Sequence, residues 1–206
     1  MKLYHHPMSS SARRARMAAI QLGLSPELVH VELTKGEQRK PEYLALNPNG
    51  KVPTLVDGDL VIWESNAIMT YLAQKTPGQT LYPTELAART DVDKWLFWTA
   101  NHWSVAAGQL TFENFLKRMM GLGEPNAYAV ERANGLFTDF AKTLDATLAR
   151  SQYVVGDSLT LADLAIAPPL MYTVPAKLPV SGFTNIARWF ESIQTTEAWR
   201  ATEPQR

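Results

Sequence analysis

The sequence predicts a chain of two parts: an α/β part with a mixed four-stranded sheet, followed by an all-α helical bundle. Strand-like and helix-like segments alternate over residues 1–76, whereas only helical periodicity follows residue 86. Between them, Pro77-Gly78 and a second proline break both patterns. We therefore expect an α/β domain over residues 1–76, a linker over 77–86 and an all-helical domain over 87–206.

The segments of the first part follow the order β-α-β-α-β-β-α. We expect strands over residues 2–5, 28–33, 54–56 and 60–63, and helices over 10–22, 41–46 and 65–75. Gly23 is a typical residue after a helix end, and Pro41 is a typical first helical residue. Asp57-Gly58 between two apolar runs favours a β-hairpin. The first β-α-β unit requires a parallel strand pair and the hairpin adds an antiparallel pair, so the sheet should be mixed.

The second part carries apolar residues at helical spacing. We expect a long helix over residues 86–120, a second over 126–150 and a further one over 185–193. Thr160 and Asp163 stand at capping-box spacing before an apolar run, which predicts a helix start at this point.

Composition excludes several classes of function. Twenty basic residues balance twenty acidic residues, so no charge excess favours nucleic acid as a partner. The chain lacks both a run of apolar residues long enough to span a membrane and a secretory leader, so we expect a cytoplasmic protein that does not enter membranes. The absence of cysteine excludes a disulfide and a protein thiol nucleophile. The four histidines lack metal-ligand spacing, and we expect no metal.

Two short motifs indicate a site for a small peptide. Val52-Pro53 precedes an expected strand, and a cis peptide bond is accessible only before proline. Because proline cannot pair in a strand ladder, the backbone of Val52 would face outward. Glu64-Ser65 stands where a strand ends and a helix begins. A carboxylate beside a helix-capping hydroxyl suits a ligand with both an amine and a carboxylate.

Four motifs together resemble the glutathione S-transferase family over essentially the whole chain. The motifs are the loop His6-Pro7-Met8-Ser9-Ser10-Ser11-Ala12-Arg13-Arg14, Lys51-Val52-Pro53, Glu64-Ser65, and Gly156-Asp157-Ser158-Leu159-Thr160-Leu161-Ala162-Asp163. In the same order, they resemble the catalytic serine loop of the phi, theta and zeta classes, the cis-proline segment, the γ-glutamyl clamp and the capping box of the helical domain. The loop is similar to phi-type sequences. It departs from the zeta type at Ser11, where zeta has cysteine, and this argues against the zeta-class isomerase reaction.

The resemblance implies a thioredoxin-like first domain and a homodimeric, cytoplasmic detoxification enzyme. Glutathione would be the co-substrate, and its thiolate would attack a small hydrophobic electrophile. Ser9 aligns with the family's catalytic serine, and Ser10 is the alternative. Whichever serine has this role would donate a hydrogen bond to the thiolate at a helix N-terminus rather than attack the substrate. Simple helix capping by the three serines is the structural alternative.

The resemblance also assigns the binding residues. Val52 would pair its backbone with glutathione, held by Pro53, while Glu64 and Ser65 would bind the γ-glutamyl amine and carboxylate. Gln38, Arg39, Lys40 and Lys51 would lie near the glycine carboxylate. The electrophile pocket is expected between the domains, with Trp103, Phe112, Phe115 and Met119 as candidates. Two other functions stay open: a glutathione-dependent isomerase or peroxide reductase, and a non-catalytic binding or regulatory module.

Overall fold

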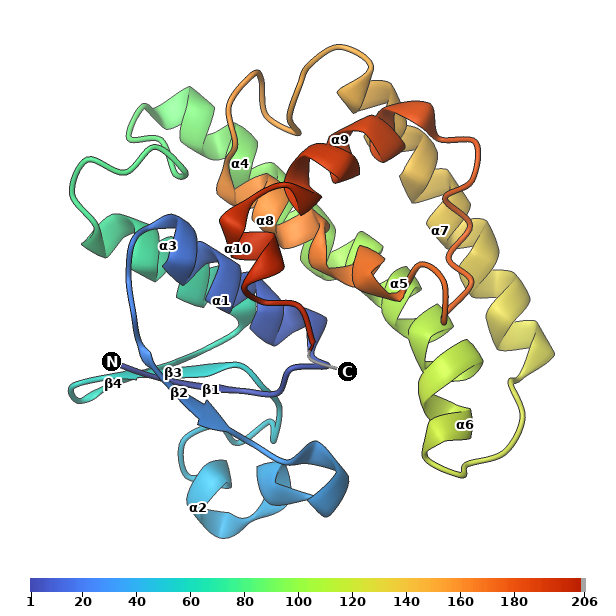
Figure 1. Cartoon of the computed structure of the whole chain (residues 1–206), viewed down its shortest axis with the longest axis horizontal. Helices are drawn as coiled ribbons and strands as arrows, with labels where there is room; N and C mark the ends of the chain where they lie inside the picture. The colour runs from blue at the N-terminus through green and yellow to red at the C-terminus, as the bar shows by residue number, and fades with distance from the viewer. Residues whose placement is uncertain (205–206) are drawn as a thin grey trace. The chain divides into compact units, whose positions relative to one another are not determined.

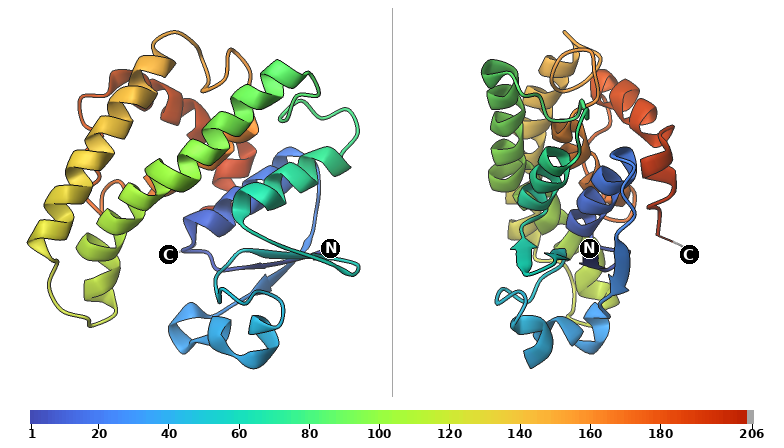
Figure 2. Two further views of the ribbon diagram at one scale, coloured as in Figure 1. Left: turned by 180° about the vertical axis from the view of Figure 1, so that it is seen from behind. Right: turned by 90° about the vertical axis from the view of Figure 1, so that its left-hand side faces the viewer.

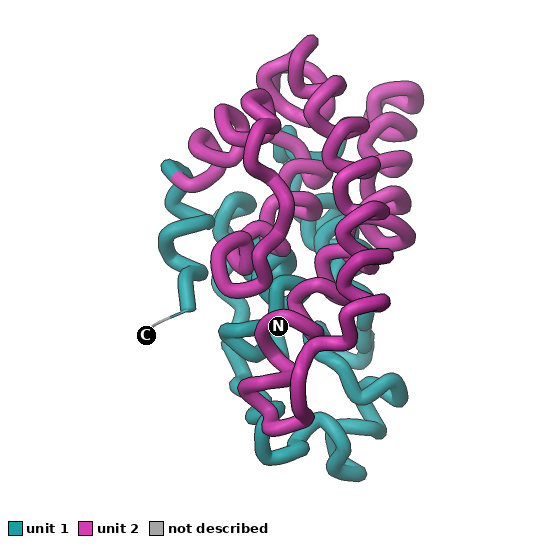
Figure 3. Tube along the Cα trace, turned by 90° about the vertical axis from the view of Figure 1, so that its right-hand side faces the viewer, with its two compact units in different colours: residues 1–82, 195–206 teal, residues 83–194 magenta. Residues whose placement is uncertain are grey.

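The computed structural model describes residues 1–204 of the chain, and these form two compact units. One unit comprises residues 1–82 and the C-terminal segment from Thr195, and the other comprises residues 83–194 (Figure 3). The all-helical domain expected over 87–206 therefore loses its last segment to the first unit. The final two residues of that expected range lie outside the described residues. No helix within residues 1–204 is long and apolar enough to cross a membrane.

The first unit contains the expected mixed sheet. Its strands are β1 (Lys2–His5), β2 (Glu27–His30), β3 (Thr54–Asp57) and β4 (Leu60–Trp63), in the spatial order β2-β1-β3-β4. β1 runs parallel to β2 and antiparallel to β3, and β3 is antiparallel to β4. Gly58 has a φ of 61° in the turn between β3 and β4, which explains the glycine in this hairpin. The thioredoxin-like fold is confirmed.

Strand β2 ends three residues earlier than expected. Two short 3-10 helices follow it, η1 (Leu33–Lys35) and η2 (Glu37–Arg39). The side chain of Glu32 accepts a hydrogen bond from the Thr34 N–H at 3.1 Å and so caps η1. Gly36, with a φ of 70°, then provides the left-handed residue between the two turns. This local side-chain bond competes with the strand ladder and ends the alternation.

Helices cover both faces of the sheet. The helices of the first unit are α1 (Ser10–Gln21), α2 (Pro41–Leu44), α3 (Ser65–Lys75) and the short C-terminal α10 (Glu197–Arg200), which packs against α1. Helices α1 and α3 cover one face and α2 lies on the other (Figure 1). Buried residues of β1, β3, α1 and α3 form the larger core: Leu3, Ala15, Ala19, Leu55, Ile68 and Leu72. The next residue of β1, Tyr4, points to the opposite face, where its ring meets that of Tyr43 edge-on at 5.8 Å.

The C-terminal segment belongs to the first unit because it is held by Arg13 of α1. The buried guanidinium donates to the Trp199 carbonyl at 2.8 Å and to the Thr202 hydroxyl at 3.0 Å. It also stacks on the Trp199 ring, 3.6 Å from its centroid. These contacts give Arg13 a structural role in the first unit.

The second unit is entirely helical. Its elements are α4 (Leu86–Trp98), η3 (Thr99–Trp103), α5 (Ser104–Thr111), η4 (Phe112–Leu116), α6 (Lys117–Met119), α7 (Ala127–Leu148), α8 (Leu161–Ile166), η5 (Pro168–Tyr172) and α9 (Thr184–Gln194). The first five form one continuous helical run in place of the single helix expected over 86–120. The segments η3 and η4 are π-helical. The run lies beside α7 (Figure 2), where the rings of Trp103 and Phe137 meet at 4.3 Å.

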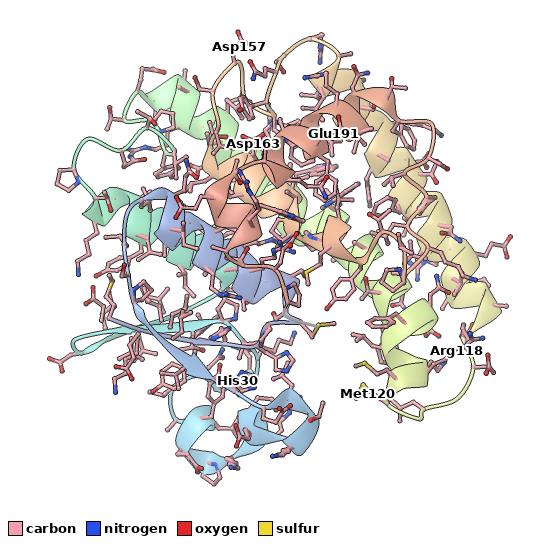
Figure 4. The ribbon with its side chains drawn as sticks, viewed as in Figure 1. His30, Arg118, Met120, Asp157, Asp163 and Glu191 are labelled. Atoms are coloured by element: carbon pink, nitrogen blue, oxygen red, sulfur yellow. The ribbon has the colours of Figure 1, made fainter. Side chains whose placement is uncertain are left out.

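The capping box predicted at Thr160 and Asp163 is present at the start of α8. Asp163 accepts the Thr160 N–H at 2.8 Å through one oxygen. Its other oxygen accepts the Val154 N–H and the indole N–H of Trp189 in α9, both at 2.9 Å. The carboxylate is fully buried inside the helical unit (Figure 4), so one residue caps α8 and also ties it to two other segments.

Candidate functional site

The strand register brings the predicted binding segments to one end of the sheet. Tyr4 of β1 pairs with Thr54 of β3, and Thr54 pairs with Trp63 of β4, so these three residues form a row across the sheet. The residues that follow β1 and β4 and those that precede β3 therefore gather beyond this row. They are the loop that leads to Ser9, the pair Val52–Pro53, and the pair Glu64–Ser65.

Ser9 is the N-cap of α1. Its hydroxyl accepts the Ala12 N–H at 3.1 Å, and Ser9 has extended backbone angles, as a cap residue should. The hydroxyl uses a lone pair for this bond and keeps its proton to donate elsewhere. Ser10 is the first residue of the helix itself. Both serines are partly exposed, and the hydroxyl of Ser9 stands where the helix dipole favours negative charge.

Hydrogen bonds to His6 shape the loop before Ser9. The Ser9 N–H donates to the His6 carbonyl at 2.9 Å, which closes a turn. The Met8 N–H donates to the imidazole Nδ1 of His6 at 3.2 Å. The position of the cap residue therefore depends on the orientation of one imidazole ring.

The peptide bond between Val52 and Pro53 is cis, as the sequence predicts. Two side chains that sequence reasoning missed hold this segment. The Tyr43 hydroxyl donates to the Lys51 carbonyl at 2.7 Å and lies 2.9 Å from the Thr54 hydroxyl. The Asn47 amide donates to the same two oxygens, at 2.8 and 3.1 Å. Burial raises the pKa of Tyr43, which keeps its hydroxyl protonated. Asn47 lies in the same sequence motif, and this proximity is the one signal that could have identified it.

Glu64 and Ser65 mark the junction between β4 and α3. Glu64 has a φ of 73°, which is unusual for a residue other than glycine and places strain at this position. Ser65 is buried and begins α3, and its hydroxyl accepts a bond from Arg14 of α1 at 3.5 Å. Burial lowers the pKa of Arg14 to about 10, against the raising effect of the Glu64 charge, so Arg14 stays positive at neutral pH. No sequence pattern indicates that Arg14 reaches this junction.

The four residues expected near the glycine carboxylate lie on two loops. Gln38 and Arg39 belong to η2, which comes so close to Gly50 that a Cβ on Gly50 would lie 2.9 Å from the Gln38 carbonyl. This contact places η2 beside the segment that leads to Val52. Gln38 has a buried side-chain oxygen for which the described residues offer no hydrogen-bond partner. Lys40 pairs with Glu37 at 3.3 Å, and the side chain of Lys51 is exposed.

The four candidates for the electrophile pocket have different environments in the helical unit. Trp103 has no exposed surface, and its indole N–H donates to the Ile166 carbonyl at 3.0 Å. It is a core residue of that unit, and its assignment to a pocket is corrected. Phe112 and Met119 are exposed, and Phe115 is partly buried with its ring 5.8 Å from that of Tyr172.

One cluster has the donor atoms to hold a metal ion. His6, His30 and Glu32 each offer a ligand atom, and these atoms lie within 4.8 Å of one another. Sequence spacing did not reveal the cluster because its members lie at the ends of two different strands that the register brings together.

Comparison with known proteins decides the family. The family model described as "Glutathione S-transferase, N-terminal domain" matches residues 1–74, and "Glutathione S-transferase, C-terminal domain" matches residues 127–192. Glutathione S-transferase 3 of Zea mays is 36% identical over 208 residues, which cover 98% of this chain and 92% of the relative. The chain belongs to the glutathione S-transferase family.

Solved structures of other glutathione S-transferases have the same fold. The crystal structure of glutathione transferase F7 from Populus trichocarpa matches with a TM-score of 0.88 at 28% identity, covering 98% of this chain and 96% of that one. Glutathione S-transferase-I bound with lactoylglutathione matches with a TM-score of 0.87 at 27% identity, covering 98% and 97%. This chain is therefore a glutathione S-transferase by sequence and by fold, and the family uses glutathione as its co-substrate.

Proposed function

We propose that this glutathione S-transferase adds the thiolate of glutathione to small hydrophobic electrophiles, with Ser9 as the residue that stabilises the thiolate. The observation that carries the proposal is the position of the Ser9 hydroxyl. It caps α1 at the same end of the sheet as Val52–Pro53 and Glu64–Ser65. A sulfur bound there would meet a hydroxyl proton and the positive end of a helix dipole together.

The chemistry requires no thiol from the protein. The thiolate is the nucleophilic form of glutathione, and a free thiol has a pKa of about 8.5. A hydrogen bond from Ser9 and the N-terminus of α1 favour the charged form, so more thiolate is present at neutral pH. The thiolate forms a carbon–sulfur bond with the electrophile, which either releases its leaving group or takes up a proton. Ser9 keeps its own proton throughout.

The two ends of glutathione fit different parts of the site. We assign its amine to the carboxylate of Glu64, and its γ-glutamyl carboxylate to Ser65 and the backbone N–H groups at the start of α3. Val52 would pair its backbone with the cysteinyl part, as an added strand pairs with a sheet edge. The buried oxygen of Gln38, with Arg39, Lys40 and Lys51, supplies donors, acceptors and charge for the glycine end.

We assign the electrophile to apolar side chains of the helical unit, with Phe112, Phe115 and Met119 as candidates. We also infer a cytoplasmic homodimer, as the family resemblance implies. Sizing by light scattering checks the assembly, because a dimer doubles the 23.0 kDa mass of the chain.

Binding to immobilised glutathione tests the site before any catalytic question is asked. We expect the protein to be retained and then released by free glutathione. A protein that does not bind would contradict the transferase and both glutathione-dependent alternatives, and would favour a regulatory module. If it binds, assays with an aryl halide, a peroxide and an isomerisable substrate separate conjugation from the alternative reactions.

The assignment of Ser9 is tested with the variants Ser9→Ala, Ser9→Gly and Ser10→Ala. A hydrogen bond to a charged group is worth about 1.5–3 kcal/mol, so we expect kcat/KM to fall about 10- to 100-fold in both Ser9 variants. Glycine keeps most of the cap stability, which separates catalysis from folding. The thiol of bound glutathione should titrate at a higher pH, as ultraviolet absorbance of the thiolate would report. Equal activity of Ser9→Gly and the wild type, with a loss in Ser10→Ala, would transfer the role to Ser10.

A further inference from the structure

We propose that His6, His30 and Glu32 form a binding site for a divalent transition-metal ion such as Zn²⁺ or Ni²⁺, and that filling this site changes the loop that positions Ser9. The His6 Nε2 atom lies 3.8 Å from one carboxylate oxygen of Glu32, and the His30 Nε2 atom lies 3.6 Å from the other. The two imidazole rings are 5.2 Å apart between centroids. Three ligand groups therefore face a common point.

The fold brings the three residues together. In the parallel pair of β1 and β2, His5 is in register with His30. His6 follows directly on the first strand, and Glu32 lies two residues beyond the end of the second. His30 is exposed at the end of β2 (Figure 4), so an ion can reach the cluster from solvent.

The donor set selects the class of ion. Two imidazoles and one carboxylate suit Zn²⁺, Ni²⁺ and related ions, whereas Mg²⁺ and Ca²⁺ prefer oxygen ligands alone. Zinc–ligand bonds of about 2.0–2.1 Å in a tetrahedron place the ligand atoms about 3.3 Å apart. The two nitrogen–oxygen separations of 3.6 and 3.8 Å need to close by only a few tenths of an ångström, and all three ligand atoms lie within 4.8 Å of one another. The remaining positions of the ion would hold water.

Glu32 is already held in place for this role. One of its oxygens accepts the Thr34 hydroxyl at 2.7 Å and the Thr34 N–H at 3.1 Å. The other oxygen is directed at His30. Hydrogen bonds that orient a ligating carboxylate are a regular feature of metal sites, because they reduce the freedom that binding would remove.

His6 couples the site to the catalytic loop. Its Nδ1 accepts the Met8 N–H, so in the neutral ring the proton is on Nε2. A metal ion on Nε2 requires that proton to leave Nε2 and Nδ1 to carry one instead. The Nδ1–H of His6 and the backbone N–H of Met8 would then be two donors that face each other. The hydrogen bond of 3.2 Å between these two nitrogen atoms must therefore break. Metal binding and the present position of the segment before Ser9 are therefore mutually exclusive.

Binding is measured by calorimetry on the full chain with Zn²⁺ and then Ni²⁺, in buffer without glutathione. The chain contains only four histidines, so His102→Ala in the helical unit is a matched control for His30→Ala. We expect one ion per chain, about tenfold or more weaker binding in His30→Ala and Glu32→Gln, and unchanged binding in His102→Ala. Absence of binding, or equal affinity in the wild type and His30→Ala, would overturn the site. His30 is exposed, so thermal unfolding of the variant should match the wild type.

The coupling has its own readout in the amide NMR signals of Met8 and Ser9. We expect both to shift when Zn²⁺ binds to the wild type and to stay in place in His30→Ala. An ion that binds without moving the Met8 signal would overturn the coupling. Because neither experiment uses glutathione, failure here is distinct from failure of the transferase assignment.

Discussion

At the residue scale, the segment before β3 depends on side chains that are not themselves expected to touch glutathione. Tyr43 and Asn47 bind the same two oxygens, the Lys51 carbonyl and the Thr54 hydroxyl. Val52 and Pro53 lie between those two oxygens in sequence. Fixing the residues on both sides limits how far the backbone of Val52 can move, so the pairing edge offered to the peptide is ordered before binding.

We predict that removing this support weakens glutathione binding more than it slows turnover. Loss of one donor to the Lys51 carbonyl costs about 1 kcal/mol, so Tyr43→Phe or Asn47→Ala should raise the Kd for glutathione roughly fivefold or more. The double variant should lose more, because no donor would remain on the Lys51 carbonyl. Calorimetric titration with glutathione measures the change. Tyr128→Phe is the control, since Tyr128 is 75% exposed in the helical unit. A double variant with the wild-type Kd would contradict this role.

At the element scale, the run from α4 to α6 is connected to α7 through one buried carboxylate. Glu113 of η4 accepts the Asn126 N–H at 2.7 Å, just before α7 begins, and the Lys117 ammonium at 2.9 Å. These bonds close the loop between the two long helical segments. They also lower the pKa of Glu113, first through the backbone bond from Asn126 and then through Lys117.

We therefore predict a specific pH dependence for Glu113→Gln. A carboxyl group with a lowered pKa in the folded state stabilises the fold above its ordinary pKa of 4.5, and this contribution is lost as pH falls through and below that value. The wild type should be more stable than the variant at neutral pH, and the difference should shrink in acid. Urea unfolding at a series of pH values measures it. Glu131→Gln, at an exposed position of α7, should show no such change.

The start of α8 is the second element whose stability rests on a single side chain. Burial raises the pKa of Asp163, while the four hydrogen bonds it accepts lower it. Its replacement by alanine leaves the Val154 N–H, the Thr160 N–H and the Trp189 indole N–H without this acceptor.

We predict that Asp163→Ala lowers the free energy of unfolding by about 3 kcal/mol or more, because several buried donors lose their acceptor together. Thr160→Ala removes the cap and only one of the four hydrogen bonds to Asp163, so it should cost about 1 kcal/mol. Chemical denaturation of both variants beside the wild type checks the order. Equal losses in the two variants would show that the bonds to Val154 and Trp189 contribute little.

At the scale of the whole molecule, local patterns predicted most of the fold. Alternation, the glycine after α1 and the Asp57-Gly58 turn placed the strands and helices of the first unit within a few residues. The two π-helical segments and the early end of β2 were missed. The early end of β2 depends on a side-chain hydrogen bond to Glu32, which the alternation of apolar and polar residues does not reveal.

The candidate site divides in the same way. Three parts of the site could be predicted from neighbouring residues alone, because helix capping and the cis peptide bond before proline depend on local sequence. They are Ser9, the Val52–Pro53 bond and the Glu64–Ser65 junction. The roles of Arg14 and Tyr43 could not be predicted. Arg14 contacts Ser65, which is distant in sequence, and no sequence pattern links Tyr43 to the Lys51 carbonyl. The cluster of His6, His30 and Glu32 could not be predicted either, because the strand register brings together residues that are distant in sequence.

The return of the chain's last segment to the first unit leads to a final prediction. Trp199 is almost fully buried and covers the guanidinium of Arg13 in α1. Trp199→Ala removes a large apolar side chain and exposes that charge, so we expect a loss of about 3–5 kcal/mol in stability. The loss should appear first as faster amide hydrogen exchange in α1, which carries Ser9 at its N-terminus.

Arg200→Ala is the matched control, because Arg200 is exposed in the same short helix. Its exchange pattern should resemble that of the wild type. If α1 kept its full protection in Trp199→Ala, the C-terminal segment would be a passive cover rather than part of the folded first unit. Faster exchange in α1 would mean instead that the contact of Trp199 with Arg13 stabilises the helix that presents Ser9.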